Sequence, residues 1–470
     1  MRKTAFTLIV FLASIAAHAQ CPTADDLTVQ TALDALITTG GVLQLDARVY
    51  NICQPLIVPS NVHLRGAGRG ATIIRGAATS ACKTVLNAQV CADIAAVAAN
   101  NVSITDLTVD NHTNNHLANG VAFIPAGAAY DGQVSTNGLV EHVEVLGVPD
   151  SPPFHTYQIW NFRGQHIKIA DNWVDGNSTS NSNQEGIESY GGYDVVIANN
   201  TVRNIGSSCI NIGSAGSVAY TETVGLFAVN NYLDNCQRGV HVGTSNASGD
   251  EYSAHIHIEG NVITNSRLNG INVYPASATH IRDLLIAHNT IRVVGPSSTS
   301  DPAAGIRLYP NGTIDSSAIL STTVEDNLIA DIRGANAHGI RLISYPNARV
   351  RGNTILDTAS LGIQAMDTKS IEIVDNRFER TGAYGIDLEK STGDISSMVI
   401  AGNAFADWLS TSPGIVVSGA HFGVVRDNTF RRTDTAQPSA IAIVSSCGVT
   451  VSGNLAWYRS WTDPSVPACP

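Results

Sequence analysis

Ile371-Glu-Ile-Val-Asp-Asn376 is one copy of the sequence phrase that decides the fold: two apolar residues in alternate positions, then two further residues and an Asn. Copies of the phrase end at Asn172, Asn200, Asn231, Asn261, Asn289, Asn327, Asn353, Asn376, Asn403, Asn428 and Asn454. The steps between them range from 23 residues (Asn353 to Asn376) to 38 residues (Asn289 to Asn327). A repeat at this period predicts one solenoid, whereas a length of 470 residues alone suggests about three domains.

A second phrase, Gly followed by Ile or Val, any residue and an apolar residue, alternates with the first. Its copies begin at Gly186, where Ser189 takes the apolar place, and at Gly239, Gly270, Gly305, Gly339, Gly362, Gly385 and Gly414. Short strands of period two, separated by Asn and Gly turns without a helix-length pattern, are typical of a parallel β-helix and not of βαβ units. Asn and Gly tolerate the left-handed backbone of sharp turns, and stacked asparagines can hydrogen-bond along the stack. A leucine-rich repeat is disfavoured because Leu does not recur and the period varies.

The first 19 residues have the composition of a secretory signal peptide. Arg2 and Lys3 precede an apolar run from Ala5 to Ala17, and Ala17-His-Ala19 fits a cleavage site. The run is too short to span a bilayer. We therefore expect a secreted or periplasmic protein that begins at Gln20 and has no membrane contact after cleavage.

The rest of the chain divides into a cap, a solenoid and a tail. Apolar residues at Leu33, Leu36 and Ile37 predict a helix over Leu27 to Ile37 that ends before Gly40-Gly41. Such a helix would cover the open end of a solenoid. The predicted boundaries are 20–41 for this N-terminal cap, 42–458 for the β-helix and 459–470 for the C-terminal tail.

The eight cysteines of an exported chain favour disulfides. Proximity in the sequence favours Cys82–Cys91, Cys209–Cys236 and Cys447–Cys469, which leaves Cys21 with Cys53. Eight cysteines allow about 105 connectivities, so this choice is a preference only. The sequence has no CxxC motif, and zinc is therefore not expected.

The charge balance is acidic, with 27 Lys and Arg against 39 Asp and Glu and a net charge of −12. Cleavage would remove Arg2 and Lys3 and bring the net charge to −14. A nucleic-acid partner is disfavoured because it would need a basic surface.

Residues 40 to 458 resemble the secreted right-handed parallel β-helix proteins of the pectate-lyase-like superfamily. The opening segments Gly40-Gly-Val-Leu-Gln-Leu-Asp46 and Pro55-Leu-Ile-Val-Pro-Ser-Asn-Val-His-Leu-Arg65 look like the first turns of those polysaccharide-acting enzymes. The resemblance implies an all-β fold, a single-stranded right-handed parallel β-helix of about eleven or more coils with an N-terminal capping helix. Lyases, glycosidases, epimerases and phage tailspikes share that fold, so it does not give the reaction. The Asp-Pro-His motif of alginate epimerases and the Asn-Thr-Asp and Gly-His-Gly motifs of polygalacturonases are missing from the sequence.

Each Gly-Ile-x-apolar strand should direct its apolar residues inward and residue x outward. The x positions form what we call the polar ladder: Glu188, Asn211, His241, Asn272, Arg307, Arg341, Gln364 and Asp387, followed by the apolar Val416 and Ala442. The next outward positions include Tyr190, Tyr274, Tyr309 and Glu389. Tyrosine rings beside amide and guanidinium donors suit a sugar chain. With about 4.8 Å between strands, the ladder would be roughly 34 Å long and would fit a polymer.

The middle of the ladder predicts chemistry on a uronic-acid polymer. β-Elimination requires that a sugar carboxylate be neutralised and that the neighbouring C–H proton be removed by His or Tyr. Arg307 and Arg341, on adjacent strands, could bind the carboxylate, and Asn272 could donate to it. His241 is the candidate base, and Tyr274 or Tyr309 would protonate the leaving oxygen. The remaining ladder residues, with Tyr190 and Glu389, are predicted to bind substrate: Glu188, Tyr190, Asn211, Asn272, Gln364, Asp387 and Glu389.

Two alternatives remain open. A glycoside hydrolase needs two carboxyls about 5–9.5 Å apart. Asp387 and Glu389 would be about 6.6 Å apart along one strand, whereas Glu188 and Asp387 would be roughly 34 Å apart. Glu185 and Glu188 form a weaker pair because Glu185 falls at a turn. The third class is a non-catalytic carbohydrate-binding β-helix protein.

No cofactor is expected. The resemblance to pectate lyases makes a bound calcium ion possible. The middle of the ladder, however, has no cluster of Asp and Glu to bind one. The expected partner is an anionic polysaccharide, and the chain is expected to be a monomer.

Overall fold

The computed structural model describes residues 25–469 apart from several internal segments. These are 78–80, 112–118, 148–154, 177–182, 215–222, 245–250, 276–278, 296–301, 311–318, 320, 335, 393–394, 409–411, 434–438 and 458–462. The chain forms two compact units, of which the first ends at Ser207 and the second begins at Ser208. The predicted signal peptide and Cys21 lie outside the described residues.

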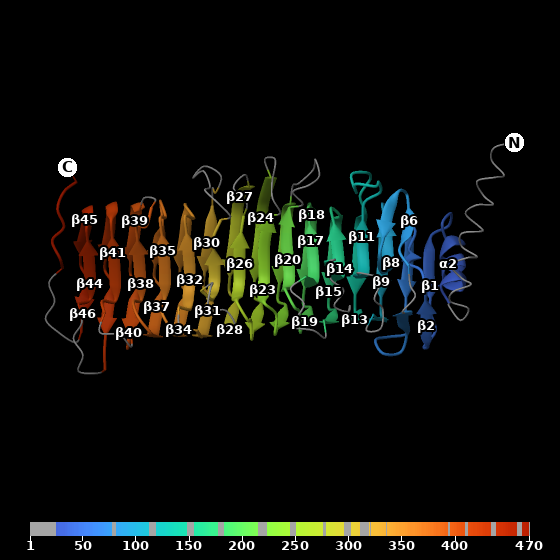
Figure 1. Cartoon of the computed structure of the whole chain (residues 1–470), viewed down its shortest axis with the longest axis horizontal. Helices are drawn as coiled ribbons and strands as arrows, with labels where there is room; N and C mark the ends of the chain where they lie inside the picture. The colour runs from blue at the N-terminus through green and yellow to red at the C-terminus, as the bar shows by residue number, and fades with distance from the viewer. Residues whose placement is uncertain are drawn as a thin grey trace. The chain divides into compact units, whose positions relative to one another are not determined.

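The first unit contains helix α2 (Asp26–Asp34), three parallel sheets and one hairpin. Successive strands enter sheets A, B and C in turn, as the blue to green part of Figure 1 shows. Sheet A contains β1 (Gly41–Gln44), β4 (Val62–Arg65), β9 (Asn100–Thr105), β12 (Thr136–Glu141), β15 (Gln165–Ala170) and β18 (Gly192–Ala198). Sheet B contains β2 (Val49–Ile52), β5 (Ile73–Gly76), β10 (Thr108–Asp110), β13 (Glu144–Leu146), β16 (Trp173–Asp175) and β19 (Thr201–Arg203). Sheet C contains β3 (Leu56–Ile57), β8 (Ala92–Val97), β11 (Asn119–Ile124), β14 (Thr156–Phe162) and β17 (Gln184–Tyr190), and the hairpin pairs β6 (Lys83–Val85) with β7 (Ala88–Val90).

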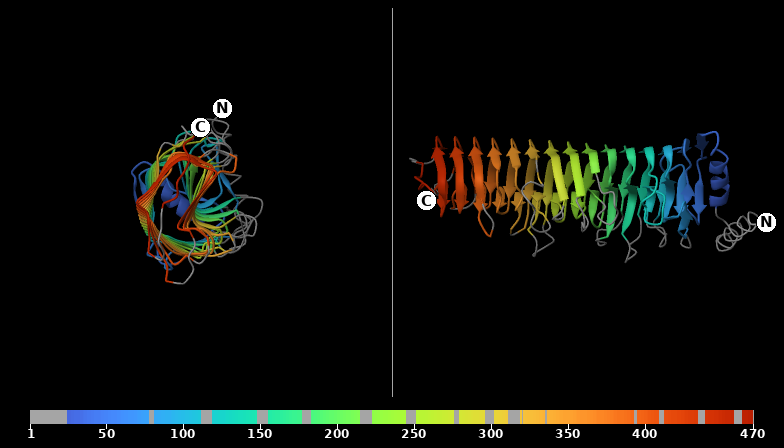
Figure 2. Two further views of the ribbon diagram at one scale, coloured as in Figure 1. Left: turned by 90° about the vertical axis from the view of Figure 1, so that its left-hand side faces the viewer. Right: turned by 90° about the horizontal axis from the view of Figure 1, so that it is seen from above.

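The second unit repeats the same three-strand coil, and its parallel strands are stacked side by side in the right panel of Figure 2, whereas the left panel looks along the stack. Sheet A contains β21 (Thr223–Val229), β24 (Glu251–Glu259), β27 (Thr279–Ala287), β30 (Thr322–Glu325), β33 (Ala348–Arg351), β36 (Glu372–Val374), β39 (Ile395–Ala401), β42 (Ala420–Arg426) and β45 (Cys447–Ser452). Sheet B contains β22 (Tyr232–Asp234), β25 (Val262–Thr264), β28 (Thr290–Val294), β31 (Leu328–Ile332), β34 (Thr354–Thr358), β37 (Arg377–Thr381), β40 (Ala404–Ala406), β43 (Thr429–Arg431) and β46 (Leu455–Ala456). Sheet C contains β20 (Ser208–Ser214), β23 (Arg238–Thr244), β26 (Asn269–Tyr274), β29 (Ala304–Leu308), β32 (His338–Ile343), β35 (Ile363–Met366), β38 (Ile386–Glu389), β41 (Ile415–Ser418) and β44 (Ile441–Val444). The predicted parallel β-helix is confirmed.

The repeated asparagines stack inside the turns between sheets A and B. In the second unit, the Nδ2 of each donates to the Oδ1 of the next along the run Asn231, Asn261, Asn289, Asn327, Asn353, Asn376, Asn403, Asn428 and Asn454, at 2.9–3.0 Å. All nine are buried. Each side chain thus satisfies a buried donor and acceptor in the neighbouring coil, as the sequence predicted for stacked turn asparagines.

The left-handed turn residue is not the repeated Asn. It is the residue immediately before it, for example Asp326 (φ 52°), Gly352 (φ 65°) and Asp375 (φ 55°). The repeated Asn is therefore required for its hydrogen bonds, and the backbone angle is taken up by Asp, Asn, His or Gly one position earlier.

The Gly of the second phrase is required by close packing. A Cβ on Gly270 would lie 2.4 Å from Cγ2 of Ile291 in the core and 2.6 Å from the carbonyl oxygen of Gly305 in the next coil. Gly270 and Ile271 therefore both face the interior, and the alternation of the strand is interrupted at this point. The residue before the Gly consequently lies on the outer face.

The N-terminal helix is shorter than predicted and uses a different apolar pair. Val29 and Leu33, four residues apart, are buried, as expected for one face of a helix. Ile37 lies beyond the helix and is exposed, so the prediction that it belongs to the helix was wrong. The helix packs against β2 and β3.

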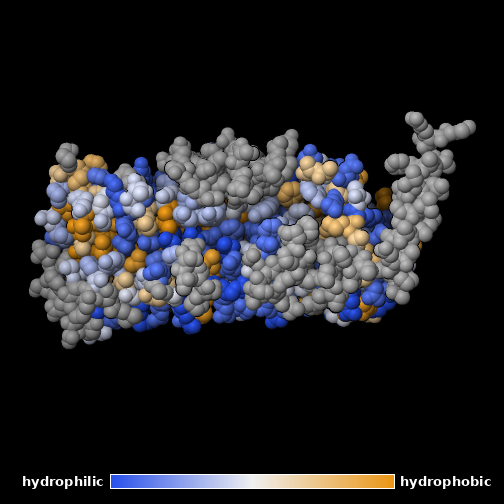
Figure 3. Space-filling model, viewed as in Figure 1, coloured by the Kyte–Doolittle hydropathy of each residue, from blue (hydrophilic) through white to orange (hydrophobic). Residues whose placement is uncertain are grey.

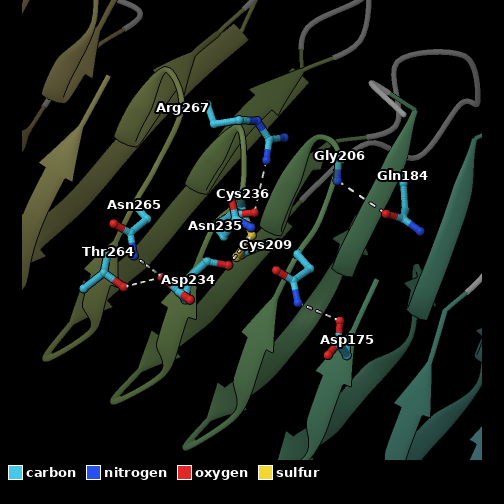
Figure 4. Close-up of a disulfide and its surroundings, with 11 residues drawn as sticks. Asp175, Gln184, Gly206, Cys209, Asp234, Asn235, Cys236, Thr264, Asn265 and Arg267 are labelled. Atoms are coloured by element: carbon cyan, nitrogen blue, oxygen red, sulfur yellow. Dashed lines mark hydrogen bonds between the residues drawn. A yellow bond between two sulfur atoms is a disulfide. The ribbon is translucent and has the colours of Figure 1, made fainter. Parts of the chain in front are cut away.

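Three of the preferred disulfides are confirmed: Cys82–Cys91, Cys209–Cys236 and Cys447–Cys469. Cys209 occupies the inward-facing position that Gly takes in other coils, and it reaches Cys236 in the turn after β22 (Figure 4). Beside that bond, Asp234 accepts hydrogen bonds from Thr264 and Asn265 of the next coil. Within the described part of the chain, no helix has both the length and the apolar character needed to cross a membrane.

Candidate functional site

The polar ladder has the register that the sequence predicted. In the second unit, Asn211 pairs with His241, His241 with Asn272, Asn272 with Arg307 and Arg307 with Arg341. The ladder continues through Gln364 and Asp387 to Val416 and Ala442. Glu188 and Tyr190 belong to β17 of the first unit. The ladder residues thus divide between the two units.

The ladder is much less exposed than an open sheet face would be. Asn272, Arg307 and Asp387 are only 2%, 7% and 9% exposed, and Asn211 and Glu188 are also buried. The prediction of a solvent-exposed face is therefore wrong for these side chains. His241 is half-buried, and its ring folds over Gly243, where a Cβ would lie 2.4 Å from Nε2.

His241 and Asn272 form a hydrogen-bonded pair. The Nδ2 of Asn272 donates to Nδ1 of His241 over 2.9 Å, which places the imidazole proton on Nε2. Burial lowers the pKa of His241 to about 3, the charges of Arg238 and Arg307 lower it further, and a hydrogen bond with the backbone of Asn272 raises it by less than Arg238 lowers it. Oδ1 of Asn272 is buried and has no hydrogen-bond partner among the described residues. In this arrangement the imidazole is neutral with its proton on Nε2, and Oδ1 of Asn272 is enclosed.

Two arginines and two tyrosines adjoin this pair. The guanidinium of Arg307 lies 4.7 Å above the ring of Tyr309, and the rings of Tyr309 and Tyr274 are 5.7 Å apart. Nε of Arg341 donates to Oε1 of Gln364 at 2.9 Å. Figure 3 shows hydrophilic residues gathered on the face in view, over the region where Figure 1 labels β23, β26 and β32. This part of sheet C is thus a cationic surface with half-buried phenols.

A second outer column, which the sequence analysis missed, runs beside the ladder. It contains Arg238, Asn269 and His338, which are aligned in register through Ala304. The charge of Arg238 acts on His241, and Arg341 with burial lowers the pKa of His338 to about 3, so column and ladder share a face. Strict alternation assigns these residues to the interior, and only the interruption at the Gly reveals them. The signal was a polar residue immediately before Gly239, Gly270 and Gly339.

The interruption of the alternation at the Gly also gives Glu185 a different position from the predicted one. It lies inside β17, is buried and pairs with Tyr157 of β14, whereas the sequence placed it at a turn. Glu188 pairs with Trp160 in the same two strands. Both carboxylates therefore belong to the outer face of the first unit.

Asp387 and Glu389 are the two carboxylates of β38. Burial raises the pKa of Asp387 to about 6, and the charge of Glu389 adds to this effect. Glu389 is exposed at the end of the strand. A buried carboxylic acid beside an exposed carboxylate is an arrangement suited to proton donation near neutral pH.

Two hollows at the surface of the described residues lie on sheets A and B. One of about 540 Å³ on sheet B is lined by Arg377, Ala404, Phe405, Ala406, Thr429, Arg431 and Trp457. One of about 270 Å³ on sheet A is lined by Ser321, Thr322, Thr323, Asn347, Ala348, Arg349, Ser370 and Glu372. Neither includes a ladder residue, so we assign the candidate site from side-chain chemistry and register.

The described residues contain one group with metal-ligand spacing, formed by His421, Cys447 and Cys469. Its two cysteines are bonded to each other, so their thiolates cannot coordinate an ion.

Comparison with known proteins agrees on the architecture. Residues 284–456 match the family model described as right handed beta helix region. No curated protein matches the chain in sequence. A mutant tailspike protein of E. coli bacteriophage HK620 in complex with pentasaccharide is similar in structure, with a TM-score of 0.58, 15% identity and coverage of 91% of this chain and 76% of the tailspike.

Two enzymes are also similar in structure. The A-module of an Azotobacter vinelandii mannuronan C-5 epimerase has a TM-score of 0.38 and 15% identity, with coverage of 93% of this chain and 96% of the module. The catalytic unit of a Streptomyces thermodiastaticus α-1,3-glucanase has a TM-score of 0.46 and 16% identity, with coverage of 94% and 68%. At these identities the likenesses concern the fold. The chain is a right-handed parallel β-helix protein, as the resemblance in its sequence implied.

Proposed function

We propose that this chain is an exported polysaccharide lyase that cleaves a uronic-acid-containing polymer by β-elimination at sheet C of the second unit. The observation that carries the proposal is the alignment of Arg238, Arg307 and Arg341 on one outer face around the neutral His241–Asn272 pair. Three guanidinium groups in a largely buried setting favour an anionic ligand, whatever the acidic charge of the whole chain.

The residue roles follow from the contacts. Arg307 and Arg341 bind the sugar carboxylate, because guanidinium groups on adjacent strands match its two oxygens. Nε2–H of His241 donates a further hydrogen bond to the ligand. Because Nδ1 of His241 accepts from Asn272, our proposal does not use His241 as the base and differs here from the sequence hypothesis.

The proton transfers are assigned to Tyr274 and Tyr309. One phenolate takes the proton from the sugar carbon next to the carboxylate, and the electron pair forms a C=C bond as the neighbouring C–O bond breaks. The leaving oxygen takes a proton from the second phenol. The guanidinium of Arg307 lies over the ring of Tyr309, which places this phenol beside the group that would bind the sugar carboxylate.

A carbohydrate ligand and export have independent support. The tailspike with the similar fold is seen in complex with a pentasaccharide. The three disulfides suit an oxidising compartment, which agrees with a secreted or periplasmic location.

The test offers the purified chain a panel of acidic and neutral polysaccharides, with and without added calcium. A lyase produces an ultraviolet-absorbing unsaturated uronate at each cleaved bond. New reducing ends without that absorbance would overturn the lyase assignment in favour of a hydrolase. Binding without cleavage would support the non-catalytic alternative.

A hydrolase at Asp387 and Glu389 is the second candidate, and the raised pKa of Asp387 favours it. In that reaction, Asp387 protonates the glycosidic oxygen and Glu389 acts on the opposite face of the sugar. Loss of reducing-end production in Asp387→Asn, with Arg341→Ala still active, would select this candidate.

A further inference from the structure

Four aromatic rings are in contact on sheet C of the first unit and form what we call the aromatic cluster: Tyr130, Tyr157, Trp160 and Phe162. Tyr157 is stacked on Trp160, with 5.2 Å between centroids and 18° between planes, and Trp160 is 5.4 Å from Phe162. Tyr130 meets Trp160 and Phe162 edge-on at 6.1 and 5.8 Å. The cluster takes no part in the uronate site proposed above, which lies in the other unit.

The cluster belongs to the outer face of the sheet. Ile159 is fully buried and faces the core, so its neighbour Trp160 points to the opposite side. Tyr130, Tyr157 and Trp160 are each only partly buried. Aromatic residues that serve the core are enclosed, as Phe378 and Phe430 are in the second unit, whereas these three rings present apolar surface outward.

Two carboxylates border the rings. Tyr157 pairs with Glu185 and Trp160 pairs with Glu188 on the adjacent strand β17. Burial raises the pKa of Tyr157 above its ordinary value, and Glu188 and Glu185 contribute by their charges and by a hydrogen bond between Glu188 and the phenol. The apolar surface therefore has buried hydrogen-bond acceptors directly beside it.

The indole N–H of Trp160 is a buried donor of the cluster. Nε1 of Trp160 is inaccessible and has no hydrogen-bond partner in the described part of the chain. An unpaired indole N–H costs free energy unless a ligand or water accepts from it.

Two hydrogen bonds hold Tyr130 in place within the aromatic cluster. The hydroxyl of Tyr130 donates to the carbonyl of Gln89 at 2.8 Å, and the Tyr130 carbonyl accepts from Nη1 of Arg163 at 2.6 Å. A fixed edge-on ring reduces the ordering that a ligand would have to impose.

We infer that the first unit carries a binding site for an uncharged sugar residue at the aromatic cluster. The C–H face of a sugar ring stacks on the exposed aromatic surface, and its hydroxyls donate to Glu185 or Glu188. The two carboxylates repel a uronate, so this site has the opposite charge preference from the arginine-rich site of the second unit.

The experiment measures binding of neutral, amino-sugar and uronate oligosaccharides to the full chain by calorimetry and tryptophan fluorescence. A neutral oligosaccharide should bind, and Trp160→Ala should weaken its binding about tenfold or more, which corresponds to about 1.4 kcal/mol. Trp160→Phe keeps a ring but removes the N–H and should have a smaller effect. Trp457→Ala is the matched control, because Trp457 is 71% exposed and belongs to the second unit.

The charge preference has its own test. Glu188→Gln should raise the ratio of uronate binding to neutral binding, since it removes one repulsive charge while an amide oxygen can still accept from a sugar hydroxyl. Circular dichroism of each variant checks that the fold is retained, and Trp160→Phe serves if Trp160→Ala does not fold. The inference is overturned if no neutral oligosaccharide binds or if both Trp160 variants bind one as tightly as the parent chain. Failure of the uronate lyase would instead appear as unchanged cleavage in Arg307→Ala and Arg341→Ala, which leave the aromatic cluster intact.

Discussion

Asn272 donates a hydrogen bond from Nδ2 to Nδ1 of His241 across two adjacent coils, over 2.9 Å. This bond uses the only nitrogen lone pair of the neutral imidazole and turns Nε2–H toward the outer face. Burial and the charges of Arg238 and Arg307 hold the ring in its neutral form. His241 is thereby set up to donate a hydrogen bond and not to accept a proton.

The protonation of His241 gives the first prediction. Its imidazole Cε1–H resonance, assigned by comparison with His241→Gln, should not titrate between pH 5 and pH 8 because the pKa is about 3. Since the folded-state pKa lies below the ordinary value, the unfolded chain binds more protons between these values. Stability should therefore fall as the pH is lowered from about 6.5 toward 3. Asn272→Asp should raise the midpoint, because a carboxylate favours the imidazolium. A midpoint near 6.5 in the parent chain would contradict this account.

The arginines give the second prediction. Arg307→Ala and Arg341→Ala should each lower cleavage of a uronate polymer about 10–100-fold, the loss expected when a charge-assisted hydrogen bond of about 1.5–3 kcal/mol is removed. Arg341→Lys should restore little, because an ammonium lacks the planar fork. Arg349→Ala is the control, since Arg349 is exposed on sheet A and paired with Glu372. Initial rates of ultraviolet absorbance measure the effect, and unchanged rates in both Ala variants would remove these residues from the site.

The asparagine stack gives the third prediction. Asn353 accepts bonds from the backbone N–H and Nδ2 of Asn327 and donates to Asn376 and to the carbonyl of Val324. Asn353→Ala should lower the free energy of unfolding by about 2–4 kcal/mol, because several buried partners lose their bonds together. Asn265→Ala, at an exposed turn bond to Asp234, should cost about 1 kcal/mol or less. Urea unfolding compares the two, and equal costs would show that the stack adds nothing.

The architecture could be predicted because the same pattern of strands and turns recurs in successive coils of the solenoid. The spacing of the asparagines predicted the length of each coil, and the Gly phrase predicted the strand that forms sheet C. What the repeat did not reveal was which turn residue takes the left-handed backbone. Asp375 and Gly352 differ in chemistry but share that role, so no single residue type marks the position.

The candidate site could be predicted only in part. Register alone placed His241, Asn272, Arg307 and Arg341 on consecutive strands, since identical positions in successive coils must align. Arg238 was missed because alternation fails where the Gly bends the strand. The aromatic cluster was missed because Trp160 belongs to a coil that lacks the Gly-Ile phrase. Burial of the ladder could not be predicted either, because it depends on how neighbouring side chains fold over one another.

Asp387 gives the last prediction, which has the opposite sign from that of His241. Burial and the charge of Glu389 raise its pKa to about 6, so the folded chain binds more protons than the unfolded chain between about pH 4 and pH 6. The stability contributed by the protonated acid is fully present below about pH 4 and is lost as the pH rises through 6. Asp387→Asn, which stays neutral, should remove this loss, and the variant should be more stable than the parent at pH 7.5 but not at pH 4. Glu389→Gln should act in the same direction to a smaller extent, because it removes only the second cause of the shift. Urea unfolding at the two pH values measures the difference. If Asp387→Asn is less stable than the parent at pH 7.5, the ionised carboxylate of Asp387 is stabilised by its contacts. Asp387 would then not be the buried acid that a hydrolase needs.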